Sequence, residues 1–456
     1  MFRLSEAAAA LGARLLGADR AVTAVATDSR QVPAGCLFVA LRGERFDGHR
    51  FVDAALAAGA AAALVCDADV VTAPGASLLV VDDTRLALGR LAAWWRSRFP
   101  IPLVAVTGSN GKTTVKEMLA GLLRAHAGDA AVLATEGNLN NDIGLPLTLL
   151  RLTAAHRYGV LEMGMNHLGE IRHLTALARP QVAVINNAGT AHIGELGSRE
   201  NIARAKGEIL EGLPPGGVRV LNADDAFLGY WEGLRPDTRP LRFGFGAGAD
   251  VSARTEPLPT GMRLHVSSPA GPLELRLEAP GEHNARNALA AVAAALALEL
   301  PRSAIEAGLA AFGGVKGRLQ MRPGPAGCRL VDDTYNANPD SMTAAIAWLA
   351  SLPGRRVLVA GDMGELGDEA AALHAEAGAR ARGAGLDAVL GLGELSRHTV
   401  KAFGAGATHH DDVAALVAAL RPHCDADTTV LVKGSRFMRM ERVVEALSTA
   451  PAREKT

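Results

Sequence analysis

Aromatic residues, cysteines and net charge are all scarce in this chain, and each scarcity excludes a class of protein. Aromatic side chains make up only 4% of the 456 residues, so alanine, glycine and leucine must fill much of the core. Acidic and basic residues nearly cancel at a net charge of −1. This balance leaves no electrostatic footprint for nucleic acid and no polybasic patch for a membrane surface.

The four cysteines lie far apart, at Cys36, Cys66, Cys328 and Cys424, and no two form a CxxC pair. Such spacing is typical of reduced structural thiols in a cytosolic protein. No apolar run reaches the length of a membrane span, and residues 1–17 read as an amphipathic helix rather than as a signal peptide. We therefore expect a soluble, cytoplasmic protein without stable membrane insertion.

The most informative segment is residues 101–127, which reads as a strand, a glycine loop and a helix. An apolar run at 103–106 is typical of a buried parallel strand. A glycine loop at a helix start presents backbone N–H groups to a phosphate, Lys112 can reach the outer phosphates, and the Thr113 hydroxyl can hold Mg²⁺. The strict GxxxxGK[ST] pattern needs a glycine where this chain has Val106. An ordinary strand–turn–helix unit with a surface lysine is therefore the alternative.

Proline and glycine divide the chain into three predicted units, residues 1–98, 99–314 and 315–456. Strand-like runs alternate with helical segments in each unit, which predicts α/β folds with mainly parallel sheets. Residues 250–278 differ because apolar and polar residues alternate there, which predicts a small antiparallel patch. The glycines of 313–317 are candidate hinge positions.

Several polar residues are predicted just beyond the carboxyl ends of parallel strands, where ligands gather in such sheets. Glu162 ends one strand and His192 follows the next, so with Thr113 they could complete a Mg²⁺ shell. The alternatives are a capping carboxylate and a loop histidine. Lys206 lies in a helix-like stretch, where the pattern alone favours a solvated lysine. The amides of 138–142 are more numerous than a turn needs.

Three polar segments of the third unit each follow an apolar, strand-like run, at 332–342, 361–367 and 433–436. If the strands are neighbours, these segments line one face and form a ligand cleft. Asp340 is expected to be the N-cap of the helix that follows the first segment.

A set of segments, in order over nearly the whole chain, resembles the Mur ligases of bacterial peptidoglycan synthesis. They are TGSNGKTT, TEGNLNNDIGLP, LEMGMNHLGEI, NNAGTAHIGELGSRENIARAKGEI, GEHNARNALAA, GRLQ and DDTYNANPDSM. A loop without glycine at 106 is the family's own form. DDTYNANPDSM and AGDMGELG favour the members that add D-alanyl-D-alanine to UDP-N-acetylmuramoyl-tripeptide. The third unit has no DNPR-type motif of the diamino-acid-adding members.

The resemblance implies an α/β enzyme of three domains. The small N-terminal domain would bind the UDP-precursor, the central P-loop ATPase-like domain would bind ATP and Mg²⁺, and the Rossmann-like C-terminal domain would bind the dipeptide. The implied catalytic residues are Lys112, Lys206 and His192. Lys206 matches a lysine that is carbamylated in several members, and a carbamate can ligate a second Mg²⁺. We expect a monomer.

The resemblance also assigns contacts to each ligand. The implied ATP contacts are Thr107, Gly108, Ser109, Asn110, Gly111, Lys112, Thr113, Thr114, Asn287, Arg318 and Asp333. The implied metal ligands are Thr113, Glu162, His192 and, if carbamylated, Lys206. The implied substrate contacts are Ser29, Arg30, Arg42, Gly43, Asp47, Gly48, His49, Asn138, Asn140 and Asn141, with Asn336 and Asn338 in the D-alanyl-D-alanine pocket.

The chemistry implied by the resemblance is amide-bond formation through an acyl phosphate. ATP would phosphorylate a carboxylate, and the amine of the dipeptide would then displace the phosphate. Three alternatives stay open: another amino-acid-adding Mur ligase, a folylpolyglutamate-type ligase, and a non-catalytic P-loop nucleotide switch. The sequence has no motif that reads the third residue of the tripeptide, lysine or diaminopimelate.

Overall fold

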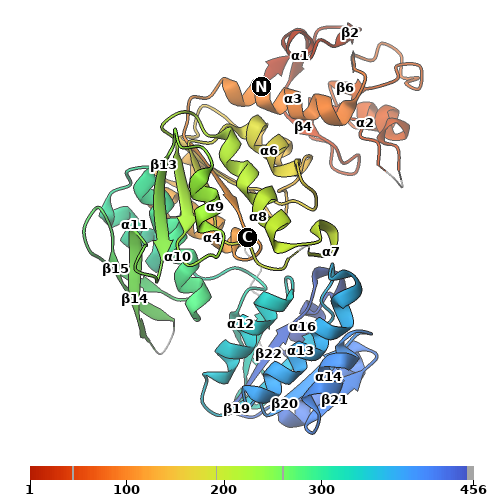
Figure 1. Cartoon of the computed structure of the whole chain (residues 1–456). Coiled ribbons are helices and arrows are strands. Elements are labelled where there is room, and N and C mark those ends of the chain that lie inside the picture. The colour runs from red at the N-terminus through yellow and green to blue at the C-terminus, as the bar shows by residue number, and fades with distance from the viewer. Residues whose placement is uncertain (44–45, 192, 259–260, 449–456) are drawn as a thin grey trace.

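The computed structural model describes residues 1–43, 46–191, 193–258 and 261–448. Three α/β bodies follow one another along the molecule, with the central one between the N-terminal and C-terminal ones (Figure 1). Each is built on its own main sheet, and all three main sheets are mainly parallel. The predicted fold class is thereby confirmed.

The N-terminal body has a five-stranded sheet in the order β2-β7-β6-β5-β4, of which only the β2–β7 pair is antiparallel. A separate two-stranded ribbon joins β1 to β3. The strands are β1 (Phe2–Arg3), β2 (Arg14–Leu16), β3 (Ala21–Val22), β4 (Val25–Ala26), β5 (Leu37–Val39), β6 (Ala62–Val65) and β7 (Leu78–Val80), and the helices are α1 (Leu4–Leu11), α2 (Val52–Ala57) and α3 (Thr84–Ser97).

The central body has a nine-stranded sheet in the order β16-β15-β14-β13-β12-β11-β8-β10-β9. The strands are β8 (Leu103–Thr107), β9 (Val132–Ala134), β10 (Tyr158–Glu162), β11 (Val182–Ile185), β12 (Val218–Asn222), β13 (Arg239–Gly244), β14 (Val251–Pro257), β15 (Met262–Ser267) and β16 (Leu273–Leu277). The helices are α4 (Lys112–Ala127), α5 (Gly144–Leu149), α6 (Glu170–Ala178), α7 (Ile193–Leu196), α8 (Arg199–Gly207), α9 (Leu228–Gly233), α10 (Glu282–Ala297) and α11 (Arg302–Ala310).

The expected antiparallel patch is confirmed, because β14, β15 and β16 pair antiparallel. They continue the central sheet rather than forming a separate one, since β14 also pairs parallel with β13. β15 buries Met262, Leu264 and Val266 and turns the residues between them outward, as its alternating sequence predicts.

The C-terminal body has a six-stranded sheet in the order β17-β18-β22-β19-β20-β21, in which only β17 runs antiparallel. The strands are β17 (Gln320–Pro323), β18 (Arg329–Asp333), β19 (Arg355–Gly361), β20 (Ala388–Leu392), β21 (Ala407–His410) and β22 (Thr428–Lys433), and the helices are α12 (Pro339–Ala350), α13 (Ala370–Gly383), α14 (Ser396–Phe403), α15 (Val413–Leu420) and α16 (Glu441–Leu447). The strands that precede the three predicted polar segments, β18, β22 and β19, are neighbours.

The N-terminal and central bodies share one hydrophobic core, whereas the C-terminal body has cores of its own. Helix α3 makes the connection, because Trp95 lies in the shared core and its Nε1 donates to the carbonyl of Leu152 at 3.0 Å. Arg96 is also buried and donates to the carbonyls of Ile101 and Ala178. The N-terminal body is thus fixed by burial to the central one.

Among the helices that the structure describes, none is long and apolar enough to cross a membrane. The expected helix over residues 1–17 is shorter than predicted, because α1 ends at Leu11 and Gly12 follows it with a φ of 65°. Residues 14–16 form β2 instead.

Candidate active site

The phosphate-loop segment, residues 107–114, joins the end of β8 to the start of α4. Gly111 has a φ of 80°, and a Cβ there would lie 2.3 Å from Asn287 Oδ1, so the position requires glycine. The first backbone N–H groups of α4 have no intrahelical partners and suit an anion. The segment lines a cavity of about 640 Å³, a size usual for small-molecule sites.

Asparagine side chains hold the backbone of this loop. The Asn110 N–H donates to Asn187 Oδ1 at 2.9 Å, and its carbonyl accepts from Asn186 Nδ2 at 2.9 Å and from Asn187 Nδ2 at 3.0 Å. Asn186 Nδ2 also donates to Asn287 Oδ1 at 2.9 Å. Because Asn186 follows β11 and Asn287 lies on α10, two elements of the central body set the shape of the loop.

Lys112, the first residue of α4, folds back over the loop and donates from Nζ to the Gly108 carbonyl at 2.7 Å. Burial lowers the pKa of its ammonium group, and the carboxylate of Glu162 acts in the opposite direction. In such a poorly solvated place a cation interacts strongly with an arriving anion. Lys112 is therefore placed to bind a polyphosphate.

Glu162 ends β10, the strand next to β8, and is 2% exposed. Asn140 Nδ2 donates to its Oε1 at 2.7 Å, while Oε2 is buried without a hydrogen-bond partner among the described residues. The Thr113 hydroxyl accepts from Arg318 Nη2 at 3.0 Å. An orphaned carboxylate oxygen and a hydroxyl are donors that Mg²⁺ prefers, so the residues fit that ion. The described ranges hold no cluster of three or more His, Cys, Asp or Glu side chains suited to a metal.

Lys206, near the end of α8, is 2% exposed. Burial holds the pKa of its ammonium group well below the ordinary value, the Lys112 ammonium lowers it further, and Asp225 acts against both. An ammonium group with such a pKa loses its proton at a lower pH than that of a surface lysine. Only the uncharged amine adds CO₂. The prediction for His192 lies outside the described residues.

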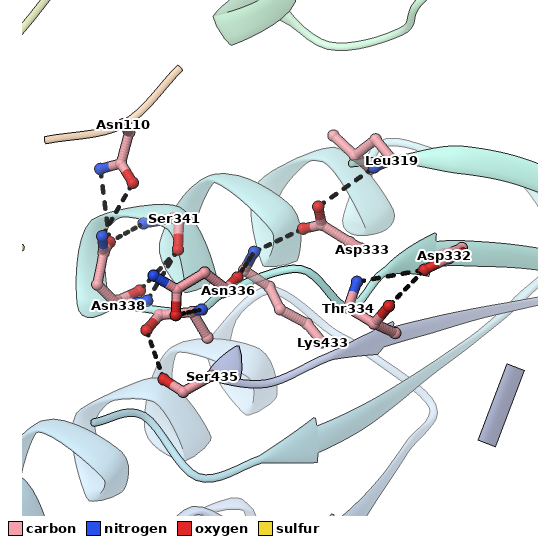
Figure 2. Close-up of polar contacts among 11 residues, drawn as sticks. Asn110, Leu319, Asp332, Asp333, Thr334, Asn336, Asn338, Ser341, Lys433 and Ser435 are labelled. Atoms are coloured by element: carbon pink, nitrogen blue, oxygen red, sulfur yellow. Dashed lines mark hydrogen bonds and ion pairs between the residues drawn. The ribbon is translucent and has the colours of Figure 1, made fainter. Parts of the chain in front are cut away.

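The C-terminal body contributes Asp333 and Lys433, at the ends of β18 and β22, to the cavity lining. Figure 2 shows the polar contacts at these strand ends. Lys433 Nζ donates to Asp333 Oδ2 at 2.7 Å and to the Asn336 carbonyl at 2.9 Å, forming a buried ion pair at these strand ends. The Arg318 guanidinium lies 4.4 Å from the centroid of the Tyr335 ring. Tyr335 thus positions the planar cation from within the C-terminal body, and from there Nη2 of Arg318 reaches the Thr113 hydroxyl of the central body.

The N-cap of α12 is Asn338 and not Asp340, which corrects the prediction. Asn338 Oδ1 accepts from the Ser341 N–H at 2.9 Å, and Pro339 is the first helical residue, a position that proline favours. Asp340 therefore falls inside the first turn, and its carboxylate reaches the central body, where it accepts from the Thr190 hydroxyl at 2.9 Å.

Three family models together match most of the chain. They are the Mur ligase family catalytic domain over residues 21–96, the Mur ligase middle domain over 106–295 and the Mur ligase glutamate ligase domain over 317–436. The chain is also 45% identical over 448 residues to the UDP-N-acetylmuramoyl-tripeptide–D-alanyl-D-alanine ligase of Escherichia coli (strain K12), covering 97% of this chain and 98% of that protein. The chain belongs to the Mur ligase family.

Solved structures of Mur ligases agree with this fold. A crystal structure of MurF from Acinetobacter baumannii is 37% identical and covers 97% of this chain and 98% of that one, with a TM-score of 0.90. The MurF ligase from Thermotoga maritima in complex with ADP is 30% identical and covers 93% of this chain and 96% of that one, with a TM-score of 0.84.

This Mur ligase brings most of the predicted ATP and metal contacts of the central and C-terminal bodies to one cavity. Among the predicted residues, those lining it are Ser109, Asn110, Gly111, Lys112, Thr114, Asn138, Asn140, Asn141, Glu162, Asn287, Arg318, Asp333, Asn336 and Asn338. Thr107, Gly108, Thr113 and Lys206 are not part of the lining. Thr107 instead donates from its hydroxyl to the Met163 carbonyl at 2.9 Å, tying β8 to the end of β10.

The predicted substrate contacts of the N-terminal body lie outside this cavity lining, on two loops of their own. They are Ser29 and Arg30 after β4, and Arg42, Gly43, Asp47, Gly48 and His49 after β5. The Arg30 guanidinium pairs with Asp28 and is the main reason that the pKa of Asp28 falls to about 2. Arg42 pairs with Asp47 at 3.2 Å.

His49 holds its loop together from inside. Its side chain is 2% exposed, its Nδ1 lies 2.6 Å from Asp47 Oδ1, and its Nε2 accepts from the Cys66 N–H at 2.9 Å. A Cβ at Gly48 would lie 2.7 Å from the Leu41 carbonyl oxygen. In this structure, His49, Asp47 and Gly48 shape the loop, and the exposed side chains of Arg30 and Arg42 are the groups left facing solvent.

Sequence reasoning gave no role to several residues that line the cavity. They are Arg199, Asp225, His283 and Arg286. Tyr335 and Lys433 also line it, and they belong to the segments 332–342 and 433–436 that the sequence predicts at a cleft. A signal existed for Asp225, because it follows the end of β12. His283 and Arg286 start α10, which crosses from the far edge of the sheet, so the chain order alone does not place them beside the phosphate loop.

Proposed function

We propose that this Mur ligase joins D-alanyl-D-alanine to UDP-N-acetylmuramoyl-tripeptide at the expense of ATP, in peptidoglycan synthesis. The carrying observation is the 45% identity, over 97% of the chain, to the E. coli ligase of that name. A cavity lined by both the phosphate loop and the C-terminal body supports a reaction between a nucleotide and a second substrate. Bound ADP in the T. maritima relative supports ATP as the nucleotide.

The reaction proceeds in two transfers. An oxygen of the tripeptide carboxylate attacks the γ-phosphorus of ATP, the bond to the β-phosphate oxygen breaks, and ADP leaves. The amine of D-alanyl-D-alanine then attacks the acyl carbon, loses a proton, and expels inorganic phosphate as the amide forms. Activation is needed because a free carboxylate would have to expel oxide.

The side chains of the central body supply the electrostatics for the first transfer. Lys112 turns from the Gly108 carbonyl to the phosphates, and the N–H groups at the start of α4 bind them. Thr113 and Glu162 would hold Mg²⁺, which when bound would offset the repulsion between carboxylate and triphosphate. Arg318 gives up the Thr113 hydroxyl and stays near the phosphates. His192 would complete this ligand set, and carbamylated Lys206, formed from amine and CO₂ with release of a proton, would hold a second Mg²⁺.

The three bodies take the three substrates. Residues 1–98 bind the UDP-precursor, with Ser29, Arg30 and the 42–49 loop as contacts. Residues 99–314 bind ATP, with Asn287 on the nucleotide side, and residues 315–456 bind the dipeptide, with Asp333 near the ribose. The polar loop of Asn138, Asn140 and Asn141 faces the junction, as its place in the cavity lining supports.

An acceptor assay tests the proposal. Purified protein is incubated with UDP-N-acetylmuramoyl-tripeptide, ATP and Mg²⁺, and phosphate release is measured with D-alanyl-D-alanine, glutamate, diaminopimelate or lysine as acceptor. Phosphate release with D-alanyl-D-alanine at least tenfold above every single amino acid is expected. Release with a single amino acid only would assign the chain to another acceptor. Nucleotide binding without acceptor-dependent release would favour a nucleotide switch.

A further inference from the structure

The side chain of Asn338, in the C-terminal body, meets the side chain of Asn110, in the phosphate loop of the central body (Figure 2). Asn338 Nδ2 donates to Asn110 Oδ1 at 2.9 Å. The two residues are 228 positions apart, and Asn338 is only 7% exposed. This contact joins the loop that grips the phosphates to the body assigned to the acceptor.

The amide of Asn338 is held rigidly from the C-terminal side. Its Oδ1 accepts from the Ser341 N–H at 2.9 Å, and its own N–H donates to Ser341 Oγ at 3.0 Å. The preceding residues are held from β22, because Lys433 Nζ donates to the Asn336 carbonyl and Ser435 Oγ to the Ala337 carbonyl, both at 2.9 Å (Figure 2). The position of the Asn338 side chain is therefore set by β18 and β22.

Asn110 is held equally firmly from the central side, since its N–H and carbonyl are bound by Asn186 and Asn187. Its side chain extends away from these bonds toward Asn338. A hydrogen bond between two fixed amides transmits position far better than one between mobile side chains, because no freedom is left to absorb a displacement.

A second contact between the same two bodies lies two residues further on, at Asp340 in the first turn of α12. Asp340 accepts from both the backbone N–H and the hydroxyl of Thr190, the latter at 2.9 Å. The Asp340 carboxylate can come this close to Thr190 only because residue 189 is glycine, since a Cβ on Gly189 would lie 2.2 Å from Asp340 Oδ2. Thr190 belongs to the segment that follows β11, so this contact is separate from the one at the phosphate loop.

We propose that Asn338 and Asp340 are positioning residues that register the C-terminal body on the phosphate loop and on Thr190, and that neither binds the dipeptide. The inference rests on the proposed function, because it explains how the amine is brought to the acyl phosphate. It replaces the prediction that Asn338 lines the D-alanyl-D-alanine pocket. The reason is geometric: the Asn338 side chain is fixed by Ser341 of its own body and points at Asn110 of the other, so its position is set by the two bodies.

The first test is a double-mutant cycle on the amide pair, read as the single-turnover rate of phosphate release. Asn338→Ser keeps a good N-cap but is too short to reach Asn110, and Asn110→Ala removes the partner. Each variant is expected to slow release by about 10- to 100-fold, the effect of misplacing reacting groups by about an ångström. The double variant should be no slower than the slower single one, because both remove the same contact.

The concentration of D-alanyl-D-alanine that half-saturates the enzyme distinguishes a positioning role from a binding role. In Asn338→Ser this concentration should stay within about threefold of the wild-type value, because the residue does not touch the dipeptide. A tenfold or greater rise with an unchanged rate at saturation would place Asn338 in the acceptor pocket and overturn the inference. Independent, multiplying effects of the two substitutions would overturn it as well.

The second test leaves every functional group in place. Gly189→Ala adds only a methyl group where Asp340 approaches, and should slow single-turnover release at least tenfold with an unchanged melting temperature. Gly229→Ala, on the exposed face of α9 with nothing within 4 Å, is the matched control and should keep the wild-type rate. Equal rates for the two glycine variants would overturn the role of Asp340. A wild-type protein without acceptor-dependent release would instead contradict the proposed function.

Discussion

The single residue with the sharpest chemical prediction is Lys206, a buried lysine whose amine has a low pKa. Lys206→Ala removes the amine that takes up CO₂, and we expect acceptor-dependent phosphate release to fall by about 10²-fold or more, as when a stabilising group is lost from a polar site. Added bicarbonate, formate or acetate should raise the phosphate release of this variant at least tenfold, because a small carboxylate can occupy the space that the Lys206 side chain leaves. Exposed Lys401→Ala is the control. Full activity without rescue would contradict the carbamate.

His283 gives a prediction for pH. Burial lowers the pKa of its imidazole to about 4, with Lys433 and Arg286 lowering it further and Asp333 acting in the opposite direction. Its ordinary value is 6.5, so between pH 6.5 and about 4 the unfolded chain binds more protons at this residue than the folded one. The stability that His283 contributes is therefore complete above pH 6.5 and is lost as the pH falls toward 4.

The substitution that tests this is His283→Gln, which cannot titrate in that range. Its melting temperature should fall less than that of the wild type between pH 7.5 and pH 5, measured by calorimetry in parallel. The difference between the two curves, rather than either curve, is the readout, because other groups titrate in both proteins. Parallel curves would show that His283 takes up its proton without cost to the fold.

Among the secondary-structure elements, the crossing of α11 over α4 makes a testable demand on one glycine. Gly308 lies inside α11, and a Cβ there would lie 2.6 Å from Leu122 Cα and 2.8 Å from Leu122 N. Backbone atoms cannot move aside as a side chain can, so Gly308→Ala must push the helices apart. We expect a loss of about 1–3 kcal/mol in the free energy of unfolding, the usual cost of overpacking.

The exposed face of helix α9 provides the control for that prediction. Gly229→Ala places its methyl group in open space, and alanine is the better helix former by about 1 kcal/mol. Denaturant unfolding should therefore separate the two variants, with Gly308→Ala less stable than the wild type and Gly229→Ala at least as stable. Since α4 begins at the phosphate loop, Gly308→Ala should also weaken nucleotide binding. Equal stability of the two variants would contradict the close crossing.

The elements that the sequence predicts best are those with one unambiguous pattern. The continuous apolar run at 103–106 predicts β8, Leu103–Thr107, to within one residue, because strands buried on both faces tolerate few polar residues. The pattern failed at β13, Arg239–Gly244, where polar and proline residues interrupt a strand that parallel pairing with β12 still stabilises. It failed at residues 14–16 as well, where a helical apolar face continues past the glycine that ends α1.

At the scale of the whole molecule, the sequence predicts which residues meet at the strand ends of one sheet. It does not predict which residues of two different bodies meet. Glu162 and Asn186 meet the phosphate loop because β10 and β11 flank β8, and strand ends in parallel sheets converge. The same rule failed for Asp362 after β19, which instead accepts from the Ser396 N–H at 2.8 Å at the start of α14. The pairing of Asn110 with Asn338 depends on how two separately cored bodies approach, which no local pattern records.

That approach is directed by the linker between α11 and β17, where the predicted hinge glycines differ in role. Gly317 packs against Tyr335, since a Cβ there would lie 3.2 Å from the Tyr335 N, so it moves with the C-terminal body. Gly313 and Gly314 are exposed with nothing within 4 Å of their Cβ positions. Of these two, Gly314 has a left-handed backbone, with a φ of 84°, and Gly313 does not.

We therefore expect Gly314→Ala to slow acceptor-dependent phosphate release by at least threefold, and Gly313→Ala to leave the rate unchanged. Alanine is disfavoured in the left-handed region by about 1–2 kcal/mol, so the chain at 314 shifts toward other angles and swings the C-terminal body away from the phosphate loop. The core of neither body is touched, so both melting temperatures should equal that of the wild type. Equal rates for the two variants would mean that contacts such as Asn110–Asn338, and not the linker, set the registration alone.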